Sequence, residues 1–146
     1  MAATRSAHAV WNGDLLAGSG VVSATTSKAF NDLSVSWKAR TEEPGGSTSP
    51  EELVAAAHAS CFSMALSAGL GKAGTPPTKL EVGASVTFVQ IEGGWKVSSS
   101  ALTVKGTVPG SDAAAFASAA EAAKDGCPIS GALKGNVALS VEATLA

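Results

Sequence analysis

The chain has 146 residues, of which 45% are hydrophobic and 15% charged, and its net charge is −2. This length suits one compact domain covering residues 1–146, with enough apolar material for a core. The small negative charge argues against binding to nucleic acid or to an anionic membrane surface, and the lack of Tyr, with four Phe and three Trp, argues against a stacking platform for single-stranded nucleic acid.

The first third of the chain is expected to form short strands. Turn-forming residues separate three strand-like runs, which are residues 7–11, 20–25 and 33–39. In the third run apolar and polar residues alternate, which is the period-two pattern of a strand with one wet face. Arg40 ends this run, and residues 41–49 form a polar loop rich in Gly, Pro, Ser and Glu.

A long helix begins after this loop with clear capping signals. Ser49 is a good N-cap, and Pro50 suits the first helical position, where its missing N–H costs nothing. Glu52 completes a capping box with Ser49, while Glu51 lies in the first turn, where the helix dipole favours a carboxylate. Cys61 belongs to a helical face that also carries apolar residues, namely Leu53, Ala57 and Met64.

The second half predicts a hairpin, two helices and a last strand. Two long strands cover residues 79–90 and 95–108 and meet at Glu92-Gly93-Gly94, a clear hairpin signal. The remaining elements are a helix over residues 111–124, a short helix that starts at Cys127-Pro128 and ends near residue 133, and a strand over residues 135–145. Groups of strands with single helices between them favour an α+β fold with mostly antiparallel sheets.

The expected location follows from two absences in the sequence. No apolar run approaches the roughly 18 residues needed to cross a bilayer, and residues 1–13 hold no hydrophobic segment followed by a cleavage site. We therefore expect a cytoplasmic protein. In that compartment a permanent structural disulfide is uncommon, so the two cysteines, Cys61 and Cys127, are expected to be catalytic, redox-active or simply buried.

Cys61 sits in the middle of the predicted helix, and two interpretations of it stay open. A buried Cys commonly behaves as a small apolar core residue. A reactive Cys61 needs a nearby cation, because an ordinary thiol has a pKa of roughly 8.5 and burial alone raises that pKa further. Arg40 is the candidate close in sequence, and Glu51 could anchor its planar guanidinium while other N–H groups hold the thiolate or a peroxide oxygen. Taken alone, Arg40 also fits a solvated loop charge, and Glu51 fits a carboxylate that only compensates the helix dipole.

Cys127 precedes Pro128, which is expected to open a helix, so Cys127 occupies the N-cap. Backbone N–H groups and the helix dipole stabilise an anion at that position, and on this ground Cys127 is the more acidic thiol. An N-cap cysteine without a redox role is the alternative. The two cysteines are too far apart in sequence to form a Cys-x-x-Cys motif, so only the fold can pair them.

His58 lies three residues before Cys61 on the same predicted helix. A Cys–His nucleophile pair and half of a metal site are both conceivable, but a metal site needs three or four ligands and the only other histidine is His8. A structural histidine with satisfied hydrogen bonds is the better interpretation. The sequence contains neither a phosphate-binding loop that ends in Lys-Ser/Thr nor a nucleophile-elbow serine.

Two cysteine-containing segments resemble one known family. Residues 49–66, SPEELVAAAHASCFSMAL, resemble the central helix of the OsmC/Ohr family, the osmotically inducible protein C and organic hydroperoxide resistance proteins. Residues 126–130, GCPIS, resemble its second cysteine motif, and residues 11–14, Arg40 and Pro109-Gly110 are also similar to OsmC. The resemblance covers essentially the whole chain, and the Ala-His before Ala-Ser-Cys is closer to the OsmC branch than to the Ohr branch.

The resemblance implies an α+β fold, an intertwined homodimer in which antiparallel sheets wrap around central helices and the active sites lie at the subunit interface. It implies a thiol peroxidase of oxidative and osmotic stress, in which Cys61 becomes a sulfenic acid and Cys127 condenses with it to a disulfide. Arg40 and Glu51 match the activating arginine and its carboxylate partner, which gives Cys61 the peroxidatic role despite the acidity argument for Cys127. The reductant would be a dithiol of the dihydrolipoyl type, and no metal, flavin or haem is required.

Three functional classes are open. The favoured one is this peroxidase, which we expect to reduce hydrogen peroxide more slowly than organic hydroperoxides because Leu53, Phe62 and Met64 make the surroundings of Cys61 apolar. The second is a binding or sensing protein with the same fold, against which the presence of all four site residues argues. The third is an acyl-transfer enzyme that uses His58 and Cys61 and has no need of Cys127.

Overall fold

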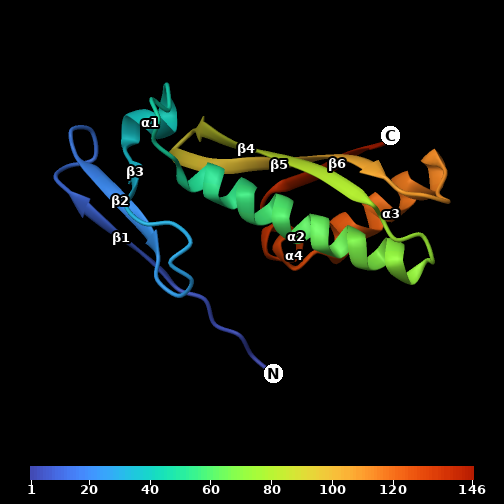
Figure 1. Cartoon of the computed structure of the whole chain (residues 1–146). Coiled ribbons are helices and arrows are strands. Elements are labelled where there is room, and N and C mark those ends of the chain that lie inside the picture. Colours follow the sequence, from blue (N-terminus) through green and yellow to red (C-terminus); the bar gives the residue numbers. More distant parts are fainter. The chain divides into compact units, whose positions relative to one another are not determined.

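The computed structural model describes residues 1–146. Its contacts divide the chain into two compact units, an N-terminal unit Met1–Leu53 and a C-terminal unit Val54–Ala146, which are described one at a time. Strands and helices form both units, and each unit has its own three-stranded sheet (Figure 1). The predicted α+β class is therefore confirmed, while the single domain over residues 1–146 stays a prediction.

The N-terminal unit contains an antiparallel sheet in the strand order β1-β2-β3. Its strands are β1 (Ala7–Asn12), β2 (Ser19–Ala24) and β3 (Leu33–Val35). Asp14 shapes the turn between β1 and β2, because its carboxylate accepts hydrogen bonds at 2.9 Å from the N–H groups of Ala17 and Leu16. These two bonds lower the pKa of Asp14. The first two predicted strands are confirmed, with ends that differ by one residue.

The third predicted strand is wrong over its second half. β3 ends at Val35, and a short helix α1 (Trp37–Thr41) follows, so Arg40 lies on a helix and not at the end of a strand. Ser36 is the N-cap of α1, and its Oγ accepts a hydrogen bond at 3.1 Å from the N–H of Ala39. The alternation of apolar and polar residues imitates a strand here, but the serine cap starts a helical turn in the middle of the pattern.

Helix α2 (Pro50–Lys72) begins where the capping signals predict. The Oγ of Ser49 accepts a hydrogen bond at 3.1 Å from the N–H of Glu52. The carboxylate of Glu52 accepts the hydroxyl of Thr48 at 2.6 Å instead of reaching back to the Ser49 amide. Only one half of the predicted capping box therefore forms, and Glu52 hydrogen-bonds to Thr48, the residue before the N-cap.

The same helix corrects the expectation that no segment is long and apolar enough to span a bilayer. α2 has 23 residues, and an 18-residue window within it reaches a mean hydropathy of 1.5. Counting uninterrupted apolar residues overlooks this window, because Ser and His interrupt the run without bringing the mean below the threshold for a span. One such helix is weak evidence for a membrane segment, since core helices of soluble proteins pass the same test.

The C-terminal unit packs its helices on one face of the second sheet (Figure 1). Its elements beyond α2 are β4 (Lys79–Ile91), β5 (Gly94–Thr107), α3 (Ala113–Gly126), α4 (Pro128–Leu133) and β6 (Ala138–Leu145). β4 and β5 form the predicted antiparallel hairpin, whereas β6 pairs with β5 in parallel. A parallel pair requires a crossover connection, and α3 and α4 supply it.

The hydrophobic core of this unit joins α2, β5 and α3. Its buried members are Phe62, Leu66, Leu70, Leu102, Val104, Val108, Phe116, Ala120, Ala123 and Cys127. The ring of Phe116 lies against the backbone of β5 at Gly106, where an added Cβ would stand 2.6 Å from the ring atom Cε2. Glycine at this position therefore lets α3 approach the sheet.

Replacing Gly106 with alanine is expected to lower the free energy of unfolding by about 1–3 kcal/mol, because the Phe116 ring is fully buried and has to move. The urea midpoint measures this loss. Gly131→Ala is the matched control, since a Cβ at that position on α4 meets no atom within 4 Å. Equal midpoints for the two variants would contradict the close approach of helix and strand.

Candidate active site

The C-terminal unit brings the two cysteines together. Cys61 lies on α2, and Cys127 is both the C-cap of α3 and the predicted N-cap of α4. Cys127 is buried and Cys61 is partly exposed; both are free thiols, and their side chains hydrogen-bond to each other. The fold therefore brings together two cysteines that are far apart in the sequence, and Cys61 is the more exposed of the two.

The surroundings act on the two thiols in opposite directions. Burial, followed by the hydrogen bond with Cys127, raises the pKa of the Cys61 thiol, against a smaller lowering by the N–H of Ile129. Burial also works to raise the pKa of Cys127, but hydrogen bonding from Cys61 and Ser130 and the N–H of Ile129 together lower that pKa below its ordinary value. Cys127 makes no side-chain cap hydrogen bond, yet the N–H groups of Ser130 and Ile129 at the start of α4 lower its pKa, as the sequence predicts.

No cation is among the groups that shift the pKa of Cys61. The C-terminal unit alone thus holds Cys61 as a thiol beside a more acidic Cys127. For Cys61 to react as a nucleophile at neutral pH, a positive charge has to be supplied from outside these contacts, because the thiolate is the reactive form.

The N-terminal unit contains a well-formed ion pair between Arg40 of α1 and Glu51 in the first turn of α2. The Nε of Arg40 donates to both carboxylate oxygens at 3.1 Å, and its Nη2 donates to Oε1 at 2.7 Å. The Glu51 side chain is 8% exposed and the Arg40 side chain 29%. The guanidinium also lies 5.9 Å from the ring centroid of Trp37. A buried carboxylate, an aromatic face and two helices therefore fix the guanidinium plane.

Arg40 borders an apolar pocket of the N-terminal unit that holds about 370 Å³. Its walls are Trp11, Leu15, Val35, Ser36, Trp37, Arg40 and Pro50. Arg40 is the charged member of this set, and the tryptophans and aliphatic side chains form most of the wall. A pocket of this kind suits a small organic molecule that carries a polar oxygen at one end.

His58 is fully buried and bonds two serines. Its Nδ1 lies 2.7 Å from the Oγ of Ser100 on β5, and its Nε2 lies 2.8 Å from the Oγ of Ser130 on α4. Burial lowers the pKa of the imidazole, which favours the neutral ring. The interpretation as a satisfied structural histidine is confirmed. Because serines occupy both nitrogens, His58 forms no nucleophile pair with Cys61.

Sequence reasoning missed the two serines that flank His58. A signal for Ser130 was present: it lies three residues after the N-cap Cys127, at the helical position that faces a cap. Ser100 stands in a run of serines on β5, and nothing in that run distinguishes the one that points into the core.

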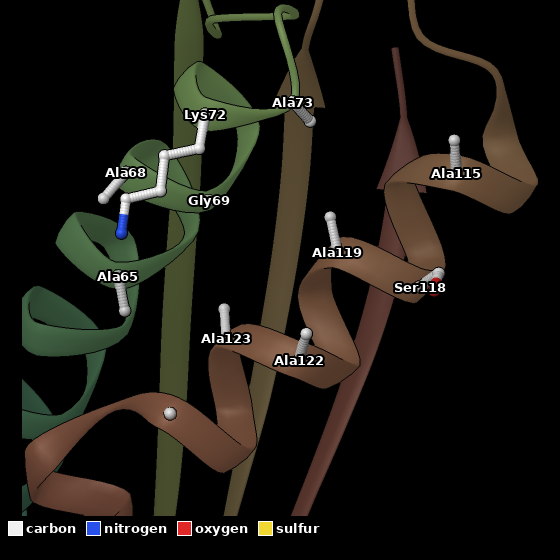
Figure 2. A pocket seen from close by; sticks show the side chains of 11 residues that line it. Ala65, Ala68, Gly69, Lys72, Ala73, Ala115, Ser118, Ala119, Ala122 and Ala123 are labelled. Atoms are coloured by element: carbon white, nitrogen blue, oxygen red, sulfur yellow. The ribbon is translucent and has the colours of Figure 1, made fainter.

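An open groove runs between α2 and α3 in the C-terminal unit (Figure 2). Small side chains line it on both helices, among them Ala65, Ala68, Ala119 and Ala122, with the longer Lys72 extending along one wall (Figure 2). The groove contains no thiol, and neither cysteine is among the residues that line it.

The sequence matches the family model of OsmC-like proteins over residues 25–142. It is 42% identical over 135 residues to Peroxiredoxin OsmC of Escherichia coli, in an alignment that covers 92% of this chain and 93% of that protein. The organic hydroperoxide resistance protein of Xanthomonas axonopodis pv. citri is 34% identical over 94 residues, 64% of each chain.

The solved structures give the same result for the fold. The organic hydroperoxide resistance protein from Elizabethkingia anophelis, crystallised with thiocyanate bound, superposes with a TM-score of 0.73 at 25% identity, covering 99% of this chain and 100% of that chain. The match confirms the OsmC/Ohr-like α+β architecture that the sequence motifs imply. The chain therefore belongs to the family of OsmC-like proteins.

Proposed function

We propose that this protein is a cysteine-based, thiol-dependent peroxidase that reduces hydroperoxides and protects against oxidative stress. The observation that carries the proposal is the direct contact of Cys61 with Cys127 in a chain of the OsmC-like family. Similar proteins are a peroxiredoxin and organic hydroperoxide resistance proteins. Two thiols in contact are what a disulfide-forming peroxidase cycle requires.

The proposed cycle assigns one step to each cysteine. The Cys61 thiol gives up its proton, and the thiolate attacks the distal oxygen of the hydroperoxide. An S–O bond forms, the O–O bond breaks, and the departing alkoxide takes up the released proton and leaves as the alcohol. Cys127 then attacks the sulfur of the Cys61 sulfenic acid; an S–S bond forms, the S–O bond breaks, and the thiol proton of Cys127 leaves with that oxygen as water. A dithiol reduces the disulfide and becomes a disulfide itself.

In this proposal Arg40 supplies the charge that Cys61 lacks. Its role in the proposal is to stabilise the Cys61 thiolate and the oxygen that departs from the peroxide. Glu51 holds the guanidinium plane and acts as a positioning residue. The bidentate geometry of their ion pair supports this division of roles.

The finer parts of the proposal concern the partners and the location. We propose an intertwined homodimer with active sites at the subunit interface, a dihydrolipoyl-type reductant and a cytoplasmic location. Met64 of α2 is 66% exposed in the single chain, which supports a second subunit that covers this helix.

Replacing Cys127 with serine is expected to leave the first oxidation intact and to stop turnover. The variant should consume about one equivalent of cumene hydroperoxide per chain and then stall or over-oxidise, because no second thiol can resolve the sulfenic acid. Peroxide consumption with dihydrolipoamide present measures this outcome. Full multiple-turnover activity of Cys127→Ser would contradict the cycle and favour an enzyme that does not use Cys127.

Organic hydroperoxides are expected to be better substrates than hydrogen peroxide, because the pocket beside Arg40 has mostly apolar walls. Burial of a cumyl or tert-butyl group should raise kcat/KM by about tenfold or more relative to hydrogen peroxide. Initial rates with each peroxide under the same reductant give the ratio. Equal kcat/KM values would rule out apolar recognition of the substrate.

A further inference from the structure

A buried chain of hydrogen bonds leads from Ser100 on β5 through His58 to Ser130 on α4, and the Ser130 side chain in turn interacts with Cys127, the resolving cysteine of the proposed cycle. Ser100, His58 and Ser130 follow one another at 2.7 and 2.8 Å, and their exposed fractions are 0%, 0% and 1%. Ser130 is the third residue after the N-cap Cys127, and the side chains at these two positions of a helix face each other. On α2, His58 and Cys61 are likewise three residues apart. The imidazole contacts Ser130, and the Cys61 thiol contacts Cys127, so two residues of α2 meet two residues at the start of α4.

The hydrogen-bond partners select one tautomer of His58. With hydrogen on Nε2, Ser100 donates to Nδ1, Nε2 donates to the Oγ of Ser130, and Ser130 keeps its own hydrogen for the Cys127 sulfur. The other tautomer would turn the Ser130 hydrogen toward the imidazole and remove the acceptor of the buried Ser100 hydroxyl. The Nε2–H form is therefore the one that leaves the Ser130 hydrogen for the Cys127 sulfur.

We propose that His58 and Ser130 are positioning residues for the resolving cysteine, with Ser130 donating its hydroxyl hydrogen to the Cys127 sulfur and His58 holding that hydroxyl in the donating orientation. The proposal rests on the proposed function, because it assigns the chain a role in the second step of the cycle. The hydrogen bond stabilises the Cys127 thiolate that attacks the sulfenic acid. The same bond stabilises Cys127 as the sulfur that leaves when the disulfide is reduced.

The titratable groups around Cys127 agree with a hydrogen-bond chain of uncharged side chains. The titratable groups that face Cys127 are the Cys61 thiol and, through Ser130, the imidazole of His58, both on α2. Lys124 of α3 lies nearby in sequence but is engaged by the carboxylates of Glu121 and Asp125. Hydrogen bonding to the hydroxyl of Ser130 thus adds to the effect of the α4 N-terminus on this sulfur.

The test separates the two chemical steps after one equivalent of cumene hydroperoxide. Formation of the Cys61 sulfenic acid is followed by trapping with dimedone, and formation of the disulfide by loss of the second thiol in rapidly quenched samples. Ser130→Ala is expected to leave the first rate within about twofold and to slow the second about tenfold or more, which is the effect of losing one hydrogen bond to a charged group. The pH at which disulfide formation is half-maximal should move upward.

Variants of His58 and Ser100 distinguish positioning from simple packing. His58→Gln keeps an N–H group near the place of Nε2 and should retain most of the rate of disulfide formation, whereas His58→Leu should slow it as Ser130→Ala does. Ser100→Ala breaks the other hydrogen bond of the same imidazole, and it should destabilise the fold as much as Ser130→Ala while slowing disulfide formation less. Equal effects of Ser100→Ala and Ser130→Ala, or an unchanged second step in Ser130→Ala, would overturn the proposal. If the wild-type protein loses no thiol to the peroxide, the proposed function itself fails.

Discussion

Replacing Cys61 with serine is expected to reduce peroxidase activity to the rate of the uncatalysed mixture, a loss of about 10³-fold or more. A serine hydroxyl is almost fully protonated at neutral pH and forms no sulfenic acid. Cys127 is the more acidic thiol in this structure, so acidity alone would favour it as the nucleophile. The Cys61→Ser variant therefore tests directly which thiol attacks the peroxide. Peroxide consumption with a dithiol reductant measures the loss.

Two controls accompany the Cys61→Ser variant: the urea midpoint of its unfolding, and the reactivity of the Cys127 thiol that it retains. Serine and cysteine are close in volume and Cys61 is partly exposed, so the urea midpoint should change little. A Cys61→Ser protein that still consumes peroxide through Cys127 would reverse the assignment of the two cysteines. The lower pKa of Cys127 at the helix N-cap would then determine which thiol attacks the peroxide, and the greater exposure of Cys61 would not.

Replacing Arg40 with methionine is expected to lower kcat/KM for cumene hydroperoxide by about 10²- to 10³-fold at pH 7. Burial already raises the pKa of Cys61, and without the guanidinium the thiol remains protonated. A thiol with a raised pKa ionises only at higher pH, so the activity of the variant should increase with pH over a range where the wild type is already constant. A pH profile of kcat/KM for both proteins measures this displacement.

Two further variants separate the charge of Arg40 from its geometry. Arg40→Lys keeps the charge but loses the planar contact with both oxygens of Glu51, and it should fall between the wild type and Arg40→Met. Glu51→Gln keeps the shape of the partner side chain and removes its charge. It should lower kcat/KM less than Arg40→Lys does. Wild-type activity in Arg40→Met would mean that the ion pair is structural.

The sequence predicts those elements whose signals are local. Ser49, Pro50 and the hairpin glycines specify backbone geometry within a few residues, and α2 and the β4–β5 hairpin are found where they indicate. The sequence does not predict the short helix α1, because the apolar alternation over residues 33–39 continues past the Ser36 cap, and the cap starts a helix at residue 37. The parallel pairing of β6 with β5 depends on a partner strand about forty residues away, so local patterns do not indicate its direction.

The candidate site, too, could be predicted from the sequence only in part. The motifs indicate Cys61, Cys127, Arg40 and Glu51, and the structure brings these residues together as two pairs, one in each unit. The contact between Cys61 and Cys127 arises from the packing of α2 against the start of α4, which no spacing in the sequence reveals. The hydrogen bonds of His58 are long-range for the same reason, since they join residues 42 and 72 positions apart.

The central claim is that Cys61 and Cys127 pass through a disulfide when the protein meets a hydroperoxide. Free thiols per chain, counted before and after one equivalent of cumene hydroperoxide and again after dihydrolipoamide is added, test it most directly. We predict that both thiols disappear and that both return. Two thiols that persist in the presence of the peroxide would contradict the account and leave Cys61 as a core residue.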